Sequence, residues 1–257
     1  MIHVSTKQES LSNRRLSRME SGEVHWRTDF LRPSDAVSHD SKAVSPQAFL
    51  IEMTPQEIIH PHFHEVEQFQ VFFEGEGQMG RTEGKLGPAV VHYTDAYTGY
   101  GPITASQQGL SYFALRPRKD PGAIYLHKEG YREKLRPSKK RHFSIPFVKS
   151  TQAVLGHLDH PVVEPLFDDS HYALDDGLSA SLVRLGPNKS FTIHSSTQSG
   201  GQYLVNIQGV LKYGDRDFAE SSVFFSEPSD FSFAVESREA GAEFLVLQFG
   251  RDLCLEC

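Results

Sequence analysis

Three histidines at alternate positions, His60, His62 and His64, are the residues of this chain best suited to chemistry. In a β-strand, side chains at alternate positions project from one face, so the three imidazoles would lie together. Imidazole is a favoured ligand for Zn, Fe, Cu and Ni. Gln68 follows four residues after the last histidine and can offer a carbonyl oxygen. The spacing predicts a metal site on a strand.

Each remaining candidate for this site has a plainer alternative. His92 follows an apolar run and could be a further ligand, or a hydrogen-bonded core histidine. Tyr100 carries a phenol whose pKa a nearby cation would lower, so it could act as acid, base or ligand, or simply pack at the rim. Gln68 could bind the metal, or orient one of the histidines. His60 lies one step nearer the strand end and could be a rim residue.

The composition is that of a globular protein. The 257 residues are enough for one large domain or two small ones, and 38% are hydrophobic and 23% charged. The formal charge of −7 argues against non-specific binding of nucleic acid. No stretch approaches the roughly 20 apolar residues that span a bilayer, so no membrane partner is expected.

The two cysteines and the N-terminus bear on the compartment. Cys254 and Cys257 are the only cysteines, which favours a reducing, cytoplasmic setting over a disulfide-stapled secreted one. Their Cys-x-x-Cys spacing could bind metal or cycle its redox state, but a lone pair on a tail is more often incidental. The first residues lack the apolar core of a signal peptide. We expect a cytoplasmic protein.

Changes in composition divide the chain into four segments. Residues 1–21 are polar, which predicts a flexible arm or a segment ordered by a partner subunit. Residues 22–117 and 147–257 consist of short apolar runs broken by turn residues, which is typical of β-sandwiches and barrels. Residues 118–146 are rich in Lys and Arg and predict a linker, partly helical over 124–134. The linker is either a solvated connector or a patch for an anionic ligand or an acidic surface of another subunit.

The two β-rich segments share a repeat. The stretch from Gln68 to Gly75 aligns with the stretch from Gln202 to Gly209. A repeat of this length indicates a duplicated domain and not a solenoid. The alignment places His194 opposite His62, while Ser196 and Phe231 stand where the other ligands would be. We expect the second copy to bind no metal and to serve an interface, in a homodimer for example.

The chain resembles a cupin, and the repeat makes it similar to a bicupin. The family's first motif has His-x-His, three or four residues, Glu, six residues and Gly. His62, His64, Gln68 and Gly75 match this spacing, with Gln in place of Glu. The second motif ends in a metal-binding histidine, near which Tyr100 falls. The resemblance implies an all-β fold of two tandem double-stranded β-helix (jelly-roll) barrels, and one divalent metal, commonly Fe, Mn, Zn or Ni, inside the first.

The resemblance favours a metal-dependent dioxygenase that acts on a small organic substrate. His62 and His64 would hold the metal, which Gln68, His92 or His60 would complete. Tyr100 and Gln68 would serve catalysis. Four aromatic residues would form an apolar wall suited to an aromatic substrate: Phe69, Phe72, Tyr97 and Phe113.

Two other functions fit the same residues. A metal-assisted lyase or isomerase would use Tyr100 as its acid or base. A non-catalytic barrel would simply bind a small ligand, as the missing Glu and the degenerate second copy suggest. Fold alone does not decide between them, and the sequence does not name the substrate.

Overall fold

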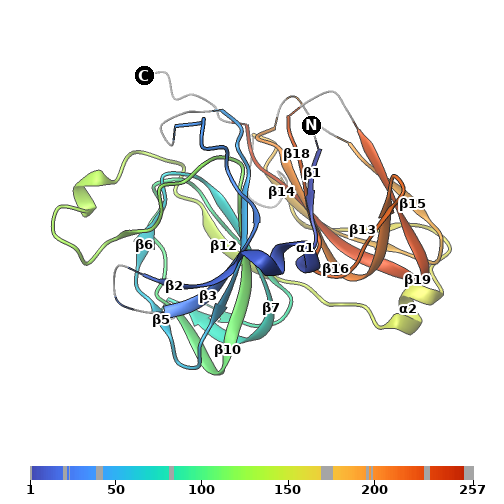
Figure 1. The fold of residues 1–257 in the computed structure, drawn as a ribbon, viewed down its shortest axis with the longest axis horizontal. Helices are drawn as coiled ribbons and strands as arrows, with labels where there is room; N and C mark the ends of the chain where they lie inside the picture. The colour runs from blue at the N-terminus through green and yellow to red at the C-terminus, as the bar shows by residue number, and fades with distance from the viewer. Residues whose placement is uncertain are drawn as a thin grey trace. The chain divides into compact units, whose positions relative to one another are not determined.

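The computed structural model describes residues 2–251 except 20, 21, 23, 39–42, 81–83, 169–175, 195, 196, 198 and 229–231. The chain forms two compact units, one of Ser10–Phe147 and the other of Met1–Glu9 with Val148–Cys257. We call them the N-terminal and the C-terminal barrel. Each is built on an antiparallel β-sheet (Figure 1). No helix in the described ranges is long or apolar enough to cross a membrane.

The N-terminal barrel has a nine-stranded sheet and a two-stranded one. The larger sheet has the order β12 (His142–Pro146), β9 (Val90–Thr94), β7 (Gln68–Met79), β10 (Ile103–Arg116), β4 (Gln47–Met53), β3 (Val24–Leu31) and β2 (Arg14–Arg18). Two short strands join it, β5 (Ile58–Ile59) on β10 and β8 (Lys85–Leu86) on β7. The smaller sheet pairs β11 (Ile124–Tyr125) with β6 (His62–Phe63).

The C-terminal barrel has one eight-stranded sheet. Its order is β1 (Ile2–Ser5), β18 (Val223–Ser226), β16 (Gln202–Tyr213), β19 (Phe233–Gln248), β14 (Ser179–Leu185) and β13 (Val162–Phe167). β15 (Ser190–Ile193) pairs with β19, and β17 (Arg216–Phe218) pairs with β16.

The described helices of the whole chain are short: α1 (Lys7–Ser10), α2 (Gln152–Gly156) and the 3₁₀ turns η1 (Leu11–Asn13) and η2 (Arg132–Lys134).

The two barrels repeat one topology, as the sequence repeat predicts. The strand order β9-β7-β10-β4-β3 of the first sheet corresponds to β18-β16-β19-β14-β13 of the second. The central strands β7 and β16 are each 12 residues long and begin at the aligned residues Gln68 and Gln202. Together with the antiparallel pairing throughout, this is the tandem jelly-roll architecture expected of the chain.

Alternation along the strands decides which side chains enter the N-terminal barrel. On β10, Tyr112, Ala114 and Arg116 face its interior, whereas Phe113 packs edge-on against Phe30 on the opposite face, with ring centroids 5.0 Å apart. The interior positions nearest Gly75, within β7, carry apolar residues and form the core. Polar side chains occupy the interior positions further along the same strands, so one end of the barrel is a packed core and the other a polar cavity.

The first 21 residues differ from the flexible arm that their composition predicts. Ile2–Ser5 forms β1 and pairs with β18, while Arg14–Arg18 forms β2 and pairs with β3. Both strands extend a sheet edge, where unpaired backbone groups favour strand addition whatever the local polarity. Local composition does not carry this signal.

The basic segment 118–146 is likewise part of the N-terminal barrel. His142–Pro146 forms β12 at the edge of the larger sheet, and Ile124–Tyr125 pairs with β6. The helix expected over 124–134 is reduced to the single 3₁₀ turn Arg132–Lys134. Strand pairing therefore replaces most of the expected linker.

Gly75 and Gly209 hold equivalent positions in the two barrels. Their φ angles are 76° and 79°. A Cβ atom would lie 2.3 Å from the carbonyl oxygen of Gly109 in the first case and 2.2 Å from that of Gly241 in the second. Only glycine accepts both the positive φ and this close approach of backbones.

We predict that Gly75→Ala and Gly209→Ala each lower the free energy of unfolding by about 3 kcal/mol, because each adds strain and a backbone clash. Urea unfolding followed by circular dichroism measures the change. Gly84→Ala is the control, since no atom of the described residues lies within 4 Å of its Cβ position. Equal unfolding free energies for Gly75→Ala and Gly84→Ala would show that position 75 does not require glycine.

Candidate functional site

The polar end of the N-terminal barrel encloses a cavity of about 400 Å³, the size of a small-molecule site. Inward-facing residues of β3, β4, β7 and β10 form nearly half of its wall. The remainder comes from the end of β2 with Met19, from Ile59 of β5, from His62, His64 and Tyr100, and from the segment 121–125.

Four residues of the sequence motifs meet in this cavity: His62, His64, Gln68 and Tyr100. His62 Nδ1 lies 2.7 Å from the carbonyl oxygen of His60 and donates to it. Its Nε2 therefore carries the lone pair, and accepts from the Tyr100 hydroxyl at 2.9 Å. The Gln68 amide nitrogen donates to the Tyr100 oxygen. The phenol is thus held between His62 and Gln68.

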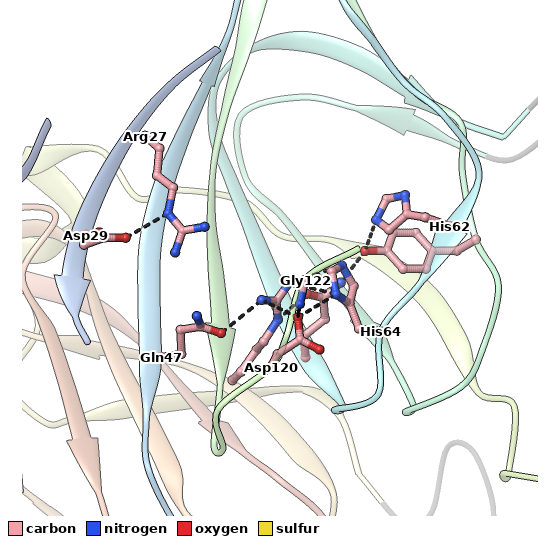
Figure 2. A network of polar contacts seen from close by, with 10 residues as sticks. Arg27, Asp29, Gln47, His62, His64, Asp120 and Gly122 are labelled. Atoms are coloured by element: carbon pink, nitrogen blue, oxygen red, sulfur yellow. Dashed lines mark hydrogen bonds and ion pairs between the residues drawn. The ribbon is translucent and has the colours of Figure 1, made fainter. Parts of the chain in front are cut away.

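Arg116, at the end of β10, is hydrogen-bonded to several residues around this cavity. Figure 2 shows Gln47, His62, His64 and Asp120 in this network of polar contacts. The Arg116 side chain is buried, and Nε and Nη2 donate to Gln68 Oε1 at 3.1 and 2.9 Å. Nη1 donates to Gln47 Oε1 at 3.1 Å and lies 3.0 Å from Asp120 Oδ2. The sequence analysis missed Arg116, because its place opposite Gln68 follows only from the register of β7 and β10.

His64 lies between Arg116 and Asp120. Its Nδ1 donates to Asp120 Oδ2 at 2.8 Å, and the backbone N–H of Gly122 donates to the same oxygen at 3.0 Å. Arg116 Nη2 lies 3.1 Å from His64 Nε2 and 3.3 Å from Nδ1. These near-equal distances place the guanidinium against the ring and not at the end of one lone pair.

The charges of this network are fixed by burial and by Arg116. Burial, and then the neighbouring His64, lower the pKa of His62 to about 3. Burial and Arg116 also lower the pKa of His64, so both rings are neutral. Burial alone would raise the pKa of Asp120, but Arg116 and His64 together lower it to about 2. Burial raises the pKa of Tyr100, which makes it a phenol and a poor base at neutral pH. The positive charge of Arg116 thus faces the negative charge of Asp120.

The donor set does not fit the divalent metal that the resemblance implies. Tyr100 donates to Nε2 of His62, Arg116 donates to the carbonyl oxygen of Gln68, and the guanidinium covers His64. A dication there would face the Arg116 charge, and the nearby carboxylate, Asp120, is already paired with Arg116 and His64. In the part of the chain that the structure describes, no group of three or more His, Cys, Asp or Glu side chains is placed to hold a metal.

His60 and His92 lie outside the cavity wall. Pro61 follows His60 and β6 begins only at His62, so the alternation does not extend to His60, whose ring lies 5.1 Å from that of His127. His92 does face the interior, and its Nδ1 lies 2.9 Å from Ser144 Oγ. Its Nε2 is buried without a partner among the described residues. His60 meets His62 through its backbone carbonyl oxygen, and the His92 ring lies 5.5 Å from the ring of Tyr100. Neither imidazole is part of the cavity wall that His62 and His64 form.

The four aromatic residues expected to contact substrate do not line the cavity. Phe69 faces Tyr93 at 5.0 Å, because its neighbours Gln68 and Gln70 are the inward-facing residues of β7. Phe113 is excluded by the same alternation on β10. Phe72 faces inward but lies deeper, in the core, and Tyr97 packs 6.2 Å from Phe63. The aromatic part of the wall is instead Phe49, Tyr100, Tyr112 and Tyr125.

Besides Arg116, further polar residues that the sequence analysis did not single out line the same cavity, among them Ser17, Arg18, His25, Arg27, Gln70 and Tyr112. Alternation on β3 directs His25 and Arg27 to the same face. In the sequence, only the alternation of polar residues within 24–31 indicates that His25 and Arg27 share a face. This pattern is hard to recognise because the segment before it is also polar. His25, Arg27 and Tyr112 each have a polar atom without a hydrogen-bond partner among the described residues. The same holds for Gln70 Oε1 and, in the Arg116 network, for Asp120 Oδ1.

In the described residues of the C-terminal barrel, the position of Arg116 is filled differently. Gln202 stands where Gln68 does, and the register places Gln248 where Arg116 stands. The Gln202 amide donates to Gln248 at 3.0 Å and to the carbonyl oxygen of His194, whose side chain is exposed. Ser196, Phe231, Cys254 and Cys257 lie outside the described residues.

Comparison with known proteins shows which solved structures share this fold. No protein-family model matches the sequence, and no curated protein sequence matches it. Among solved structures, a proposed dioxygenase from Nostoc punctiforme has a TM-score of 0.62 at 13% identity, over 98% of this chain and 84% of that one. An oxalate decarboxylase from Lactobacillus farciminis, solved as a formate complex, has a TM-score of 0.61 at 14% identity, over 94% and 85%. The fold is that of a bicupin.

A third similar structure is the bacterial pirin of Escherichia coli in complex with nickel(II). It has a TM-score of 0.57 at 11% identity, over 98% of this chain and 100% of that one. At these identities the likeness establishes the bicupin fold and not a shared activity. Function has to be argued from the cavity itself.

The two deeply buried neutral histidines make the stability of this protein depend on pH. The pKa values of His62 and His92 are each lowered to about 3, in His92 by burial and then by His142. Below the usual pKa of about 6.5, the unfolded chain binds protons that the folded chain does not. The stability that these two neutral rings contribute is therefore fully present above about pH 6.5, and it is lost as the pH drops toward 3.

We predict that each of these histidines costs about 2 kcal/mol of unfolding free energy between pH 7 and pH 5. Urea unfolding at the two pH values measures the loss. His62→Gln should reduce the difference, whereas His157→Gln, at an exposed position, should leave it unchanged. The same unfolding free energy at pH 7 and pH 5 would show that the buried rings are not held neutral.

Proposed function

We propose that this bicupin binds a small organic acid in its N-terminal cavity through Arg27, without a metal. The carrying observation is that Arg27 lines the cavity with its terminal nitrogens unpartnered among the described residues. Its Nε donates to Asp29 at 2.8 Å, and its guanidinium lies 3.6 Å from the centroid of the Phe49 ring. A planar guanidinium held in this way offers two parallel N–H donors to a carboxylate.

The charges around Arg27 favour an anion. Asp29 is shared between Arg27, Arg15 and Arg32, so one carboxylate faces three guanidinium groups. Burial lowers the pKa of Arg27 and Arg116 lowers it further, while Asp29 raises it. A carboxylate in the cavity would supply the missing negative charge.

The rest of the wall favours an acid with an apolar body. Phe49, Ile51, Ile59 and Ala114 present apolar surface to the cavity, and Tyr112 adds an aromatic face. A mostly apolar wall with a few polar groups is the usual form of a small-molecule site. A phenyl-substituted acid of modest length matches both the charge and the wall.

Titration calorimetry in the presence of chelator tests this proposal. We predict that 3-phenylpropionate and phenylpyruvate bind at least about tenfold more tightly than 3-phenylpropionamide, because only the acids pair with the guanidinium. Arg27→Met should remove this preference. Arg238→Met, which alters an exposed arginine of the C-terminal barrel, should keep it. Equal binding of acid and amide, or an unchanged preference in Arg27→Met, would contradict the proposal.

A metal-dependent oxygenase, the activity first expected from the resemblance, is the second candidate. The paired rings of His62 and His64, 5.1 Å apart, and the similarity to the Nostoc protein favour it. It requires Tyr100 and Arg116 to release His62, His64 and Gln68. This candidate predicts that acid binding is lost in chelator and restored by iron or manganese, whereas binding through Arg27 is unaffected.

A further inference from the structure

A buried histidine–carboxylate pair lies on the same wall of the cavity as Arg27. His25, two residues before Arg27 on β3, lines the cavity, and its Nδ1 lies 3.1 Å from Glu57 Oε1. Both side chains are buried from solvent, 4% and 3% exposed. The Arg116 network makes no use of this pair.

Hydrogen bonds around Glu57 fix the proton on His25. Glu57 Oε2 accepts from the backbone N–H of Thr54 at 2.9 Å and from its hydroxyl at 3.3 Å. The carboxylate is thus held as an acceptor, so the shared proton belongs to His25 Nδ1. The lone pair lies on Nε2, which has no hydrogen-bond partner in the described ranges. A base whose ring is oriented by a carboxylate is the arrangement used for proton transfer.

Tyr112 provides a donor in the same cavity. It is buried on β10, and no described residue hydrogen-bonds to its hydroxyl. Burial raises its pKa, so the phenol keeps its proton. A neutral phenol facing a cavity can donate to an oxygen on which negative charge develops.

We propose that His25 is a catalytic base that removes a proton from the carbon next to the carbonyl group of a 2-oxo acid. The inference rests on the proposed acid site, since Arg27 would hold the carboxylate. His25 Nε2 takes the proton, the C–H electron pair forms the enolate double bond, and the carbonyl electrons move to oxygen, where Tyr112 donates. Glu57 is a positioning residue that offsets the imidazolium charge. Return of a proton to carbon completes an exchange or isomerisation that needs no oxidant and no metal.

Deuterium exchange into phenylpyruvate tests this step directly. In D₂O with chelator, proton NMR follows the loss of the hydrogens on the carbon beside the carbonyl, against a blank without protein. We expect the protein to exceed the blank by about 100-fold, and His25→Ala to fall to the blank, since a positioned base contributes about that factor. Added imidazole should restore part of the rate in His25→Ala, which a purely structural role would not allow.

Glu57→Gln keeps the test decisive if His25→Ala does not fold. We expect it to slow exchange at least about tenfold and to move the pH profile of the rate. His157→Ala, at an exposed position, is the control and should keep the full rate. Exchange by His25→Ala at the wild-type rate overturns the proposal, as does an unchanged pH profile in Glu57→Gln.

The binding measurement separates the two proposals. If phenylpyruvate binds in a manner that depends on Arg27 but the wild-type protein does not exceed the blank, the acid site stands and the role of His25 is wrong. If 3-phenylpropionate binds but phenylpyruvate does not, the role of His25 is wrong and the acid site stands. If neither acid binds, both proposals are wrong.

Discussion

The buried guanidinium of Arg116 is the constraint on which the inner half of the N-terminal cavity depends. Its side chain is only 5% exposed, and a buried cation is tolerated only if it is paired and its donors are satisfied. Gln47, Gln68 and Asp120 meet this need together. Gln68 also donates to Tyr100, which a carboxylate at that position would not do at neutral pH. The replacement of the family's Glu is thus coupled to the arginine opposite it on β10.

A consequence is that the cavity has two halves with different properties. Around Arg116, the residues of the sequence motifs satisfy one another. Along β3 and at Tyr112, polar groups face the cavity with capacity left for a ligand. Function is therefore expected from the second group and not from the histidine pair that first draws attention. In the C-terminal barrel, Gln248 stands at the position of Arg116, so the described residues there hold no cation opposite Gln202.

Periodicity and the repeat predict much of the fold. Short apolar runs and the aligned stretches at Gln68 and Gln202 predict two β-barrels, and the structure confirms them. The His-x-His spacing brings His62 and His64 into one cavity. The same rule fails at His60, because the strand does not extend across Pro61. It fails for Phe69 and Phe113, because choosing the inward face requires the register as well as the period.

Other features depend on contacts between distant segments. Arg116 meets Gln68 across 48 residues, through a β7–β10 pairing whose register shifts near Tyr112. Glu57 reaches His25 across 32 residues, from a loop that no periodic pattern marks. Strands β1, β2 and β12 form because sheet edges pair, although their own sequences read as arm and linker. These long-range pairings are the information that local composition and spacing lack.

The central claim is that an internal cation, and not a metal, organises the motif histidines. Proton–nitrogen NMR of the histidine rings at pH 7, before and after one equivalent of Mn²⁺, tests it most directly. We predict neutral rings for His62 and His64, each with its proton on Nδ1, and signals that persist when Mn²⁺ is added. Selective broadening of both rings by one equivalent of the metal would show that His62 and His64 bind it, and would contradict the account.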